Sequence, residues 1–185
     1  MTQYHQKKIA MINDLSGYGR CSITAALPVL AALKIQCCPV PTSVLSNHTG
    51  FPVYFFDDYT DKMEPYIEKW KELKLSFDGI VSGFLGSERQ IQIVKNMITE
   101  FKGPKTKVIV DPIMGDHGEA YATYTESMCS KMKELAEMAD ILTPNLTEAC
   151  ILTKRPYKKN AWSRKEIEDL AEELLDMGPS GVVIT

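Results

Sequence analysis

The 185-residue sequence predicts one α/β domain, a three-layer α/β/α sandwich whose mostly parallel sheet is covered by helices on both faces. Three observations predict this fold. Short apolar runs typical of buried strands alternate with segments of helical periodicity along the chain. The segments between the strands are long enough for right-handed crossovers. No repeat, low-complexity stretch or change of composition marks a second domain, so we expect one domain over residues 1–185.

The expected strands are short runs rich in Val, Ile and Leu, as parallel strands buried on both faces usually are. They are Lys8–Ile12, Cys37–Val40, Gly79–Gly83, Lys107–Val110, Ile141–Leu142 and Gly181–Thr185. Three connecting segments lack a regular period. We expect Asn13–Arg20 to be a glycine-containing loop, Thr42–Pro52 to be irregular, and Asp116–Tyr124 to be a surface loop.

The expected helices combine an apolar face with start and stop signals. They cover Cys21–Leu33, Asp61–Leu73, a segment from Ser87, Glu126–Ala139, a short segment capped by Asn145, and a segment from Ser163 to the stop at Gly178-Pro179. Apolar residues at i, i+3, i+4 and i+7 mark the second helix, and Ala25, Ala26, Val29, Leu30 and Leu33 are the expected core of the first. A capping-box spacing opens the helices at Ser87, Asn145 and Ser163.

Composition excludes several classes of function. With 44% hydrophobic and 24% charged residues and a net charge of −3, the chain has no basic field to attract nucleic acid or an anionic membrane. No apolar run approaches the ~20 residues of a membrane span, and the polar stretch Met1–Lys8 does not have the pattern of a signal peptide. The five cysteines have no metal-binding spacing and are expected to be buried and reduced. We therefore expect a cytoplasmic location.

The last apolar run, Val182–Thr185, resembles a central strand, which a covering helix normally follows. We therefore expect the sequence to be the first two-thirds of a longer protein.

Two polar segments follow expected strands and indicate phosphoryl transfer. Asp111-Pro-Ile-Met-Gly-Asp116 comes after one strand, and Thr143-Pro-Asn-Leu-Thr-Glu148 comes after the next. In open α/β sheets, ligands bind at the carboxyl ends of the strands. The carboxylates of Asp111, Asp116 and Glu148, gathered there, would suit Mg²⁺, which uses one or two carboxylates, waters and substrate phosphates. The sequence lacks a P-loop, so helix N-termini and backbone amides are the expected phosphate-binding groups.

Five segments together resemble the pyridoxal (vitamin B6) kinases of the ribokinase superfamily. In order, they are Asn13-Asp14-Leu15-Ser16-Gly17-Tyr18-Gly19, Leu45-Ser46-Asn47-His48-Thr49-Gly50-Phe51, Ser82-Gly83-Phe84, Asp111-Pro112-x-x-Gly115-Asp116 and Thr143-Pro144-Asn145-x-x-Glu148. The Ser-Asn-His-Thr-Gly segment is the most specific, because it favours B6 kinases over the sugar kinases of the superfamily. The last two segments are shared more widely, including with hydroxymethylpyrimidine kinases.

The resemblance implies a substrate site. Asp14 is similar in position to a residue that contacts a polar group of the pyridine ring. Many B6 kinases have Ser there and hydroxymethylpyrimidine kinases have Asp, so the substrate stays open between these two. His48 and Thr49 would close over the ring, with Ser46 and Asn47 shaping their loop, and Phe84 would stack near the substrate. Without the resemblance, Asp14 would be a turn or helix-entry residue, His48 part of a surface turn, and Phe84 a core residue.

The resemblance also implies a nucleotide site. Asp111, Asn145, Glu148 and Thr185 match residues near the ATP phosphates, and Asp116, Thr143 and Glu148 match the region that organises Mg²⁺. The spacing of Asn145 and Glu148 equally predicts a plain capping box, and both roles can hold together. The family's Gly-Thr-Gly-Asp segment, which carries the catalytic base, is not in this sequence. We expect the base downstream of Thr185, no catalytic residue in this chain, and little or no activity from the chain by itself.

The function implied is ATP-dependent phosphorylation of the 5′-hydroxymethyl group of pyridoxal, pyridoxine or pyridoxamine. Mg²⁺ would assist, and a monovalent cation is a further expectation from the resemblance, as is a homodimer. Two alternatives stay open. One is a hydroxymethylpyrimidine kinase, which Asp14 favours and the segment Ser46–Thr49 disfavours. The other, if the chain ends at Thr185, is a non-catalytic ligand-binding module on a kinase fold.

Overall fold

The structure is a computed structural model that describes residues 6–185. Most of the stretch Met1–Lys8, expected not to be a signal peptide, therefore lies outside the described residues. The chain divides into two compact units, Met1–Lys107 (unit 1) and Val108–Thr185 (unit 2). The expected single domain over residues 1–185 stays a prediction, and each unit is described by itself.

Unit 1 is built on four neighbouring strands in the order β3-β2-β1-β4. They are β1 (Lys8–Tyr18), β2 (Gln36–Asn47), β3 (Phe56–Asp58) and β4 (Gly79–Ser82). β2 and β4 both pair with β1 in parallel, whereas β3 pairs with β2 in the antiparallel direction. Because β1, β2 and β4 run the same way, the residues that follow them come to the same edge of the sheet.

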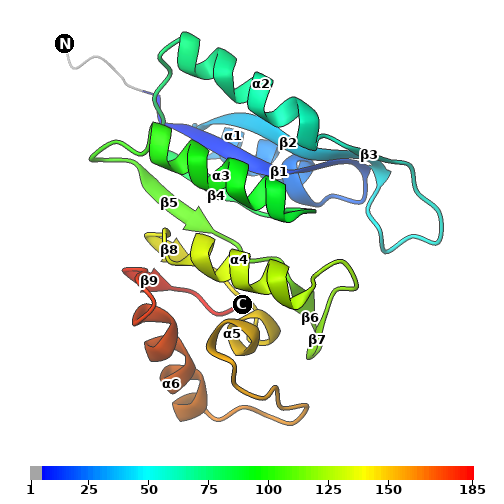
Figure 1. Ribbon diagram of the computed structural model, residues 1–185, viewed down its shortest axis with the longest axis vertical. Helices are drawn as coiled ribbons and strands as arrows, with labels where there is room; N and C mark the ends of the chain where they lie inside the picture. Colours follow the sequence, from blue (N-terminus) through cyan, green and yellow to red (C-terminus); the bar gives the residue numbers. More distant parts are fainter. Residues whose placement is uncertain (1–5) are drawn as a thin grey trace. The chain divides into compact units, whose positions relative to one another are not determined.

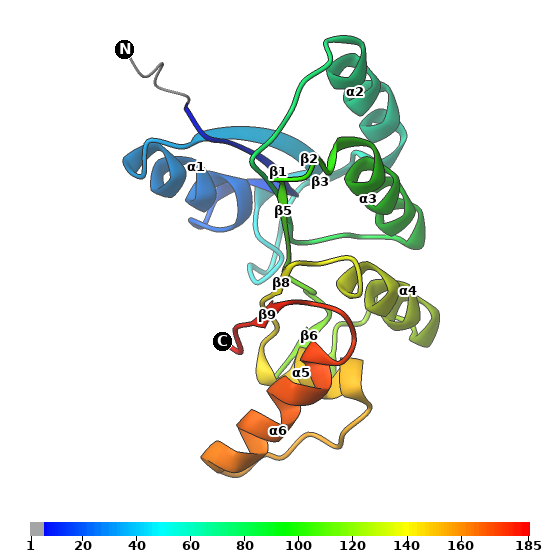
Figure 2. The ribbon, with the colours of Figure 1, turned by 90° about the vertical axis from the view of Figure 1, so that its left-hand side faces the viewer.

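Helices cover both faces of this sheet. They are α1 (Ser22–Ala32), α2 (Thr60–Glu72) and α3 (Glu88–Phe101). α1 lies on one face, and α2 and α3 lie side by side on the other (Figures 1 and 2). The apolar side of α3 is buried, and its first turn is capped by the Ser87 hydroxyl, which accepts a hydrogen bond from Gln90 N at 3.2 Å. Unit 1 therefore has the three layers that the sequence predicts.

Unit 2 continues the alternation of strands and helices. Its parallel strands are β5 (Lys107–Val110), which begins at the last residue of unit 1, β8 (Ile141–Leu142) and β9 (Gly181–Val182). β6 (Gly115–Asp116) and β7 (Glu119–Ala120) form a separate antiparallel hairpin. The helices are α4 (Glu126–Ala136), α5 (Leu146–Thr153) and α6 (Arg164–Leu175). Complete capping boxes open α5 at Asn145 and α6 at Ser163, as predicted.

Several expected boundaries are wrong, and long-range strand pairing explains the larger errors. Most of the expected loop Asn13–Arg20 belongs to β1, because β1 stays paired with β2 as far as Tyr18. Most of the expected irregular segment Thr42–Pro52 likewise belongs to β2, and β3 was not expected at all. Much of the expected loop Asp116–Tyr124 is the β6–β7 hairpin. The pairing partners lie far away in the sequence, so the local pattern does not reveal them.

Two burial expectations are also wrong. Of the residues expected as the core of α1, Val29 is 59% exposed and Leu33 is 64% exposed, whereas Ile23 is buried. α1 is apolar on nearly every side, so its periodicity does not identify the face that packs on the sheet. The last strand is two residues long rather than five, and Val183 beyond it is 55% exposed.

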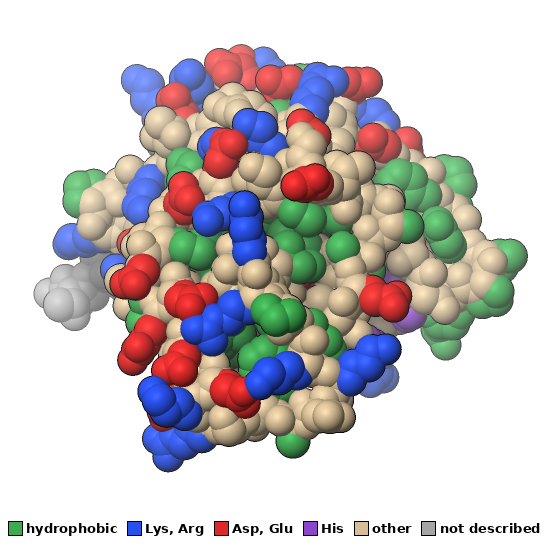
Figure 3. Space-filling view, turned by 60° about the horizontal axis from the view of Figure 1, so that its bottom comes forward, with side chains coloured by type: hydrophobic (Ala, Val, Ile, Leu, Met, Phe, Trp, Pro, Cys, Tyr) green, Lys and Arg blue, Asp and Glu red, His purple; other side chains and the backbone are tan. Residues whose placement is uncertain are grey.

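The surface and the cysteines largely agree with the composition. Figure 3 shows a face on which basic and acidic side chains are interspersed. In unit 2, Arg155 pairs with Glu173, and Lys165 pairs with Asp169 at 2.9 Å. No helix within residues 6–185 combines the length and the apolar character needed to cross a bilayer. All five cysteines are free thiols, but only Cys150 is buried and the others are partly exposed.

Candidate functional site

The residues expected to contact the substrate lie in unit 1, at the carboxyl ends of its parallel strands. Asp14 is in the last part of β1, and Ser46 and Asn47 are the last two residues of β2. Phe84 follows β4. His48 and Thr49 come directly after β2. The sheet therefore brings segments that are far apart in the sequence to one edge.

Asp14 is a buried carboxylate held by two hydroxyl groups. Its side chain is 8% exposed. The Ser16 hydroxyl donates a hydrogen bond to Asp14 Oδ2 at 2.8 Å, and the Ser22 hydroxyl donates to Asp14 Oδ1. Both donors are uncharged, so the carboxylate has no cationic partner among these contacts. It is a fixed acceptor at the end of β1.

Asn13, which the sequence reasoning did not single out, joins β1 to the segment after β4. Its Oδ1 accepts hydrogen bonds from Asp14 N at 3.0 Å and from Phe84 N at 2.9 Å. The Thr42 hydroxyl donates to Phe84 O at 3.0 Å, so both backbone polar groups of Phe84 are held. A Cβ at Gly83 would lie 2.3 Å from Asn13 Nδ2, which explains the glycine at this point of the Ser-Gly-Phe segment.

The loop after β2 is shaped by its own side chains. Ser46 Oγ accepts from Phe55 N at 2.9 Å and donates to Asn47 Oδ1 at 2.7 Å, while Asn47 Nδ2 donates to Val53 O at 2.9 Å. His48 Nδ1 accepts from Gly50 N at 3.2 Å. This bond leaves Nε2 to carry the proton of the neutral imidazole, so His48 offers a donor on its other side.

The residues expected near the nucleotide lie in unit 2, again at the carboxyl ends of parallel strands. Asp111 follows β5, Thr143 follows β8, and Thr185 lies three residues after β9. Thr143 N donates to Val110 O at 3.0 Å, and Thr185 N donates to Pro144 O at 3.0 Å. These backbone hydrogen bonds continue the pairing of neighbouring strands beyond the ends of β8 and β9. They therefore fix the backbone positions of Thr143 and Thr185.

The N-terminus of α5 fastens the Asp-Pro-x-x-Gly-Asp segment. Glu148 Oε1 accepts from Met114 N at 3.2 Å, and Glu148 Oε2 accepts from Asn145 N at 2.8 Å. Asn145 Oδ1 accepts from Glu148 N and Asn145 Nδ2 donates to Gly115 O, both at 2.9 Å. The capping box therefore also holds the backbone of the neighbouring segment, and this second role was not visible in the sequence.

The β6–β7 hairpin is held at its turn as well. Thr147 Oγ1 accepts from Gly118 N at 2.9 Å. His117 and Gly118 both have positive φ angles, 52° and 88°, as a two-residue hairpin turn requires. Asp116, at the end of β6, is exposed, and its Oδ1 accepts from His117 N at 2.7 Å.

The three acidic side chains lie in one region, because burial and then the charges of Asp116, Glu148 and Asp111 raise the pKa of Tyr121. Within residues 6–185, no group of three or more His, Cys, Asp or Glu side chains could by itself hold a metal ion. Glu148 turns both oxygens toward backbone N–H groups, and Asp116 is bonded to its neighbour His117. Spacing along the chain does not specify these side-chain directions, and the expected role of the three carboxylates in binding Mg²⁺ stays a prediction.

Two of these carboxyl groups have raised pKa values. Burial raises the pKa of Asp111 to about 6. Burial also raises the pKa of Glu148 to about 7; the nearby Asp111 charge adds to the rise, and the backbone N–H groups of Asn145 and Met114 oppose it. Each carboxylate is therefore costly to ionise where it lies. A cation nearby would favour the ionised forms, which fits the chemistry of a hard-cation site that is completed by water and phosphate oxygens.

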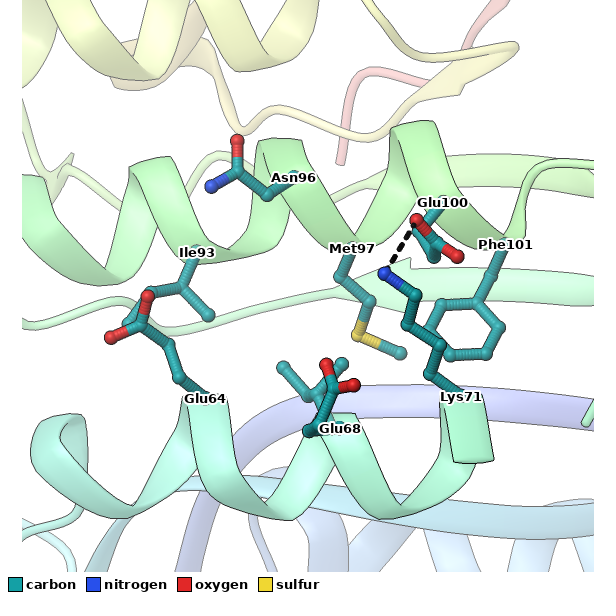
Figure 4. A pocket seen from close by; sticks show the side chains of 9 residues that line it. Glu64, Glu68, Lys71, Ile93, Asn96, Met97, Glu100 and Phe101 are labelled. Carbon is teal, nitrogen blue, oxygen red and sulfur yellow. Dashed lines mark ion pairs between the residues drawn. The ribbon is translucent and has the colours of Figure 1, made fainter. Parts of the chain in front are cut away.

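A groove elsewhere in unit 1 contains none of the predicted site residues. It lies between α2 and α3 and is shown in Figure 4. Its apolar lining includes Met97 and Phe101, and Lys71 Nζ lies 3.4 Å from Glu100 Oε2 across the two helices. A neighbouring pair, Arg89 with Glu64 at 3.1 Å, also joins these helices. We interpret these exposed pairs as surface contacts between packed helices.

Comparison with known proteins identifies the family. The family model described as phosphomethylpyrimidine kinase matches residues 19–185. The chain belongs to the phosphomethylpyrimidine kinase family. Among the curated relatives, a pyridoxal kinase of Ovis aries is 29% identical to this chain. The match covers 87% of this chain and 53% of the length of the relative. A pyridoxal kinase PdxY of Deinococcus radiodurans is 27% identical over 97% of the chain and 62% of its own length.

Solved structures of the family agree with the fold. A candidate phosphomethylpyrimidine kinase from Bacteroides thetaiotaomicron is 44% identical, with a TM-score of 0.95 over 100% of this chain and 64% of that chain. A second crystal form of the Bacteroides protein, with pyridoxal, gives a TM-score of 0.93 at 44% identity, over 98% of this chain and 63% of that one. The pyridoxal kinase of Lactobacillus plantarum is 28% identical, with a TM-score of 0.87, over 97% of this chain and 63% of that one. The predicted α/β fold is confirmed, and the chain spans less than two-thirds of the length of each of these proteins.

Proposed function

We propose that the protein containing this chain is an ATP-dependent kinase of vitamin B6, which phosphorylates the 5′-hydroxymethyl group of pyridoxal, pyridoxine or pyridoxamine. The observation that carries the kinase assignment is the match of residues 19–185 to the phosphomethylpyrimidine kinase family. The α5 capping box supports it, because Glu148 and Asn145 fasten the Asp-Pro-x-x-Gly-Asp segment. Vitamin B6 is the proposed substrate because the curated relatives are pyridoxal kinases and a structure 44% identical to this chain contains pyridoxal.

In this proposal, unit 1 binds the acceptor substrate. Asp14 accepts a hydrogen bond from a polar group of the ring, and His48 and Thr49 close over the ring. Phe84 contributes an aromatic face. The hydroxyl oxygen of the substrate attacks the γ-phosphorus of ATP, the bond from that phosphorus to the bridging oxygen breaks, and ADP leaves. We assign no residue of this chain as the base that takes the hydroxyl proton.

Unit 2 serves the nucleotide in this proposal. Asp111, Asp116, Thr143 and Glu148 would organise Mg²⁺, with Glu148 acting through water because backbone N–H groups already occupy its oxygens. Mg²⁺ would neutralise charge on the phosphates. Thr185 and Asn145 would lie near the phosphates, and a monovalent cation would assist. We further propose that the protein is a cytoplasmic homodimer, which the family resemblance supports.

The test is phosphate transfer by the full-length protein from ATP to each B6 vitamer and to 4-amino-5-hydroxymethyl-2-methylpyrimidine. We expect transfer to at least one vitamer at a higher kcat/KM than to the pyrimidine. Failure on all vitamers would overturn the B6 assignment.

Hydroxymethylpyrimidine kinase is the second candidate, because the family model carries a pyrimidine kinase description and Asp14 is an acceptor that suits an amino group. Transfer to the pyrimidine alone would establish it.

Asp116→Asn tests the assignment of the metal region. The substitution keeps the size of the side chain but removes its charge. We expect a loss of Mg²⁺-dependent turnover larger than any loss of substrate affinity. Glu119→Gln, on the neighbouring strand β7, is the matched control and should leave turnover within twofold. An unchanged rate for Asp116→Asn at saturating Mg²⁺ would contradict the assignment.

A further inference from the structure

The segment between β1 and α1 has an unusual backbone. Gly19, Arg20 and Ser22 have φ angles of 124°, 52° and 51°. Glycine adopts positive φ readily, but arginine and serine adopt it at a conformational cost. Two non-glycine residues in this conformation within three positions persist only where the surrounding structure compensates for that cost, and such residues cluster at functional sites.

Ser22 uses this conformation to reach Asp14. Its hydroxyl donates a hydrogen bond to Asp14 Oδ1, eight residues away in the sequence. The hydroxyl is not a helix cap, because the N-cap of α1 is Cys21 and the described side chains provide no cap hydrogen bond there. A serine near the start of a helix usually accepts a hydrogen bond from a backbone N–H group of the first turn. Here the Ser22 hydroxyl donates a hydrogen bond to a buried carboxylate instead.

Ser16 provides a second hydroxyl to the same carboxylate, at 2.8 Å from Asp14 Oδ2. One donor on each oxygen fixes the plane and direction of the carboxylate. An ionised carboxylate can only accept hydrogen bonds. A ligand group that binds the remaining lone pairs of Asp14 must therefore be a hydrogen-bond donor.

The same segment also contacts the second residue expected over the substrate. A Cβ at Gly19 would lie 2.3 Å from His48 Cδ2, so the imidazole packs directly on the backbone there. The His48 ring also lies 4.6 Å, centroid to centroid, from the Phe51 ring, and Phe51 lies 5.5 Å from the Tyr18 ring. The segment Gly19–Ser22 thus touches Asp14 at one end and His48 at the other.

We propose that Ser22 is a positioning residue that acts through Asp14: its hydroxyl, together with that of Ser16, orients the carboxylate as an acceptor for a hydrogen-bond donor on a heteroaromatic ligand. The donor would be a ring N–H, an amino group or a hydroxyl group. This inference rests on the proposed function, in which Asp14 contacts the ring. It adds a specificity rule: a ligand that presents only an acceptor to Asp14 is excluded.

Ser22→Gly separates this role from a structural one. Glycine removes the hydroxyl and, at φ 51°, also relieves the backbone strain. The lost hydrogen bond opposes this relief, so we expect a melting temperature close to that of the wild type, while KM for pyridoxine rises about tenfold and kcat stays within twofold. A residue that only supported the fold would not give a stable protein with weakened binding.

Lys34→Gly is the matched control. Lys34 follows the other end of α1 with φ 60°, and it belongs to no predicted site. The Lys34→Gly variant should have a higher melting temperature than the wild type and a KM within twofold of the wild-type value. Ser16→Ala removes the second donor without changing a left-handed residue, and it should raise KM in the same direction. The double variant Ser16→Ala/Ser22→Gly should approach the KM of Asp14→Ala.

The measurement uses the full-length protein, with turnover and equilibrium binding of both pyridoxine and 4-amino-5-hydroxymethyl-2-methylpyrimidine. If the wild type binds a ligand but phosphorylates neither compound, the proposed function fails, and the binding data still test Ser22. If the wild type binds neither compound, both assignments are overturned. If Ser22→Gly and the double variant bind as tightly as the wild type, the positioning role is overturned.

Discussion

Raising the pH should destabilise the protein through Glu148. This side chain is 3% exposed, and burial raises the pKa of its carboxyl group from 4.5 to about 7. The native state therefore binds this proton more tightly than the unfolded state does. The stability that results is fully present below about pH 4.5 and is lost as the pH rises through about 7.

The expected size follows from linkage between protonation and folding. Between about pH 5.5 and about pH 8.5, Glu148 should lower the free energy of unfolding by about 2 kcal/mol. Asp111, whose pKa burial raises from 3.8 to about 6, should add a loss of about 1 kcal/mol over the same range. Most of the loss is assigned to Glu148 because more of its titration falls inside this range.

Urea unfolding at the two pH values measures this loss. In Glu148→Gln, the side chain at this position is uncharged at both pH values. The free energy of unfolding of this variant should therefore fall by only the ~1 kcal/mol expected from Asp111. Glu172→Gln, at an exposed position of α6, should behave like the wild type. The reasoning is refuted if wild-type stability is equal at the two pH values, or if Glu148→Gln loses as much as the wild type.

Substitutions at four further positions test single contacts, each by urea unfolding. Asn145→Ala should cost about 2 kcal/mol, whereas Asn145→Asp, which keeps the cap but loses the bond to the β6 backbone, should cost about half of that; equal losses would contradict the double role. Gly118→Ala should cost about 2–3 kcal/mol, because its φ is 88° and its Cβ would lie 2.4 Å from Tyr157 Cδ1; a neutral result would show that the turn relaxes. Lys74→Gly should stabilise by about 0.5–1 kcal/mol, since Lys74 follows α2 with φ 52°; destabilisation would contradict a left-handed helix end. Ser82→Ala should be neutral or stabilising by up to about 1 kcal/mol, because within residues 6–185 its buried hydroxyl has no hydrogen-bond partner; a loss above about 1 kcal/mol would reveal a missing partner.

The sequence was sufficient where the signal is local. Helix starts depend on residues three positions apart, and the caps at Ser87, Asn145 and Ser163 lie where the spacing predicts. Parallel pairing was also predictable, because strands separated by helices return in the same direction. The positions of Asp111 and Thr143 directly after their strands followed from this order, whereas Asp14, expected in a loop, lies within β1.

The sequence was insufficient where the partner lies far away. The full length of β1 and the existence of β3 depend on pairing with β2, which no local window contains. Asn13 was missed for the same reason, because its bond to Phe84 N spans 71 positions. The burial of α1 was misjudged because an evenly apolar helix gives no preferred face.

The sequence by itself determined the alternation of the main parallel strands with helices, the resemblance to the family, and which polar residues come to the strand ends. Only the tertiary structure decided what those residues do there. It turned both Glu148 oxygens to backbone N–H groups rather than toward Asp116, and it bent the segment before α1 so that the Ser22 hydroxyl reaches Asp14. The reason is physical: residue types and spacing set local backbone preferences, whereas the direction of a side chain is set by the donors and acceptors that folding brings beside it.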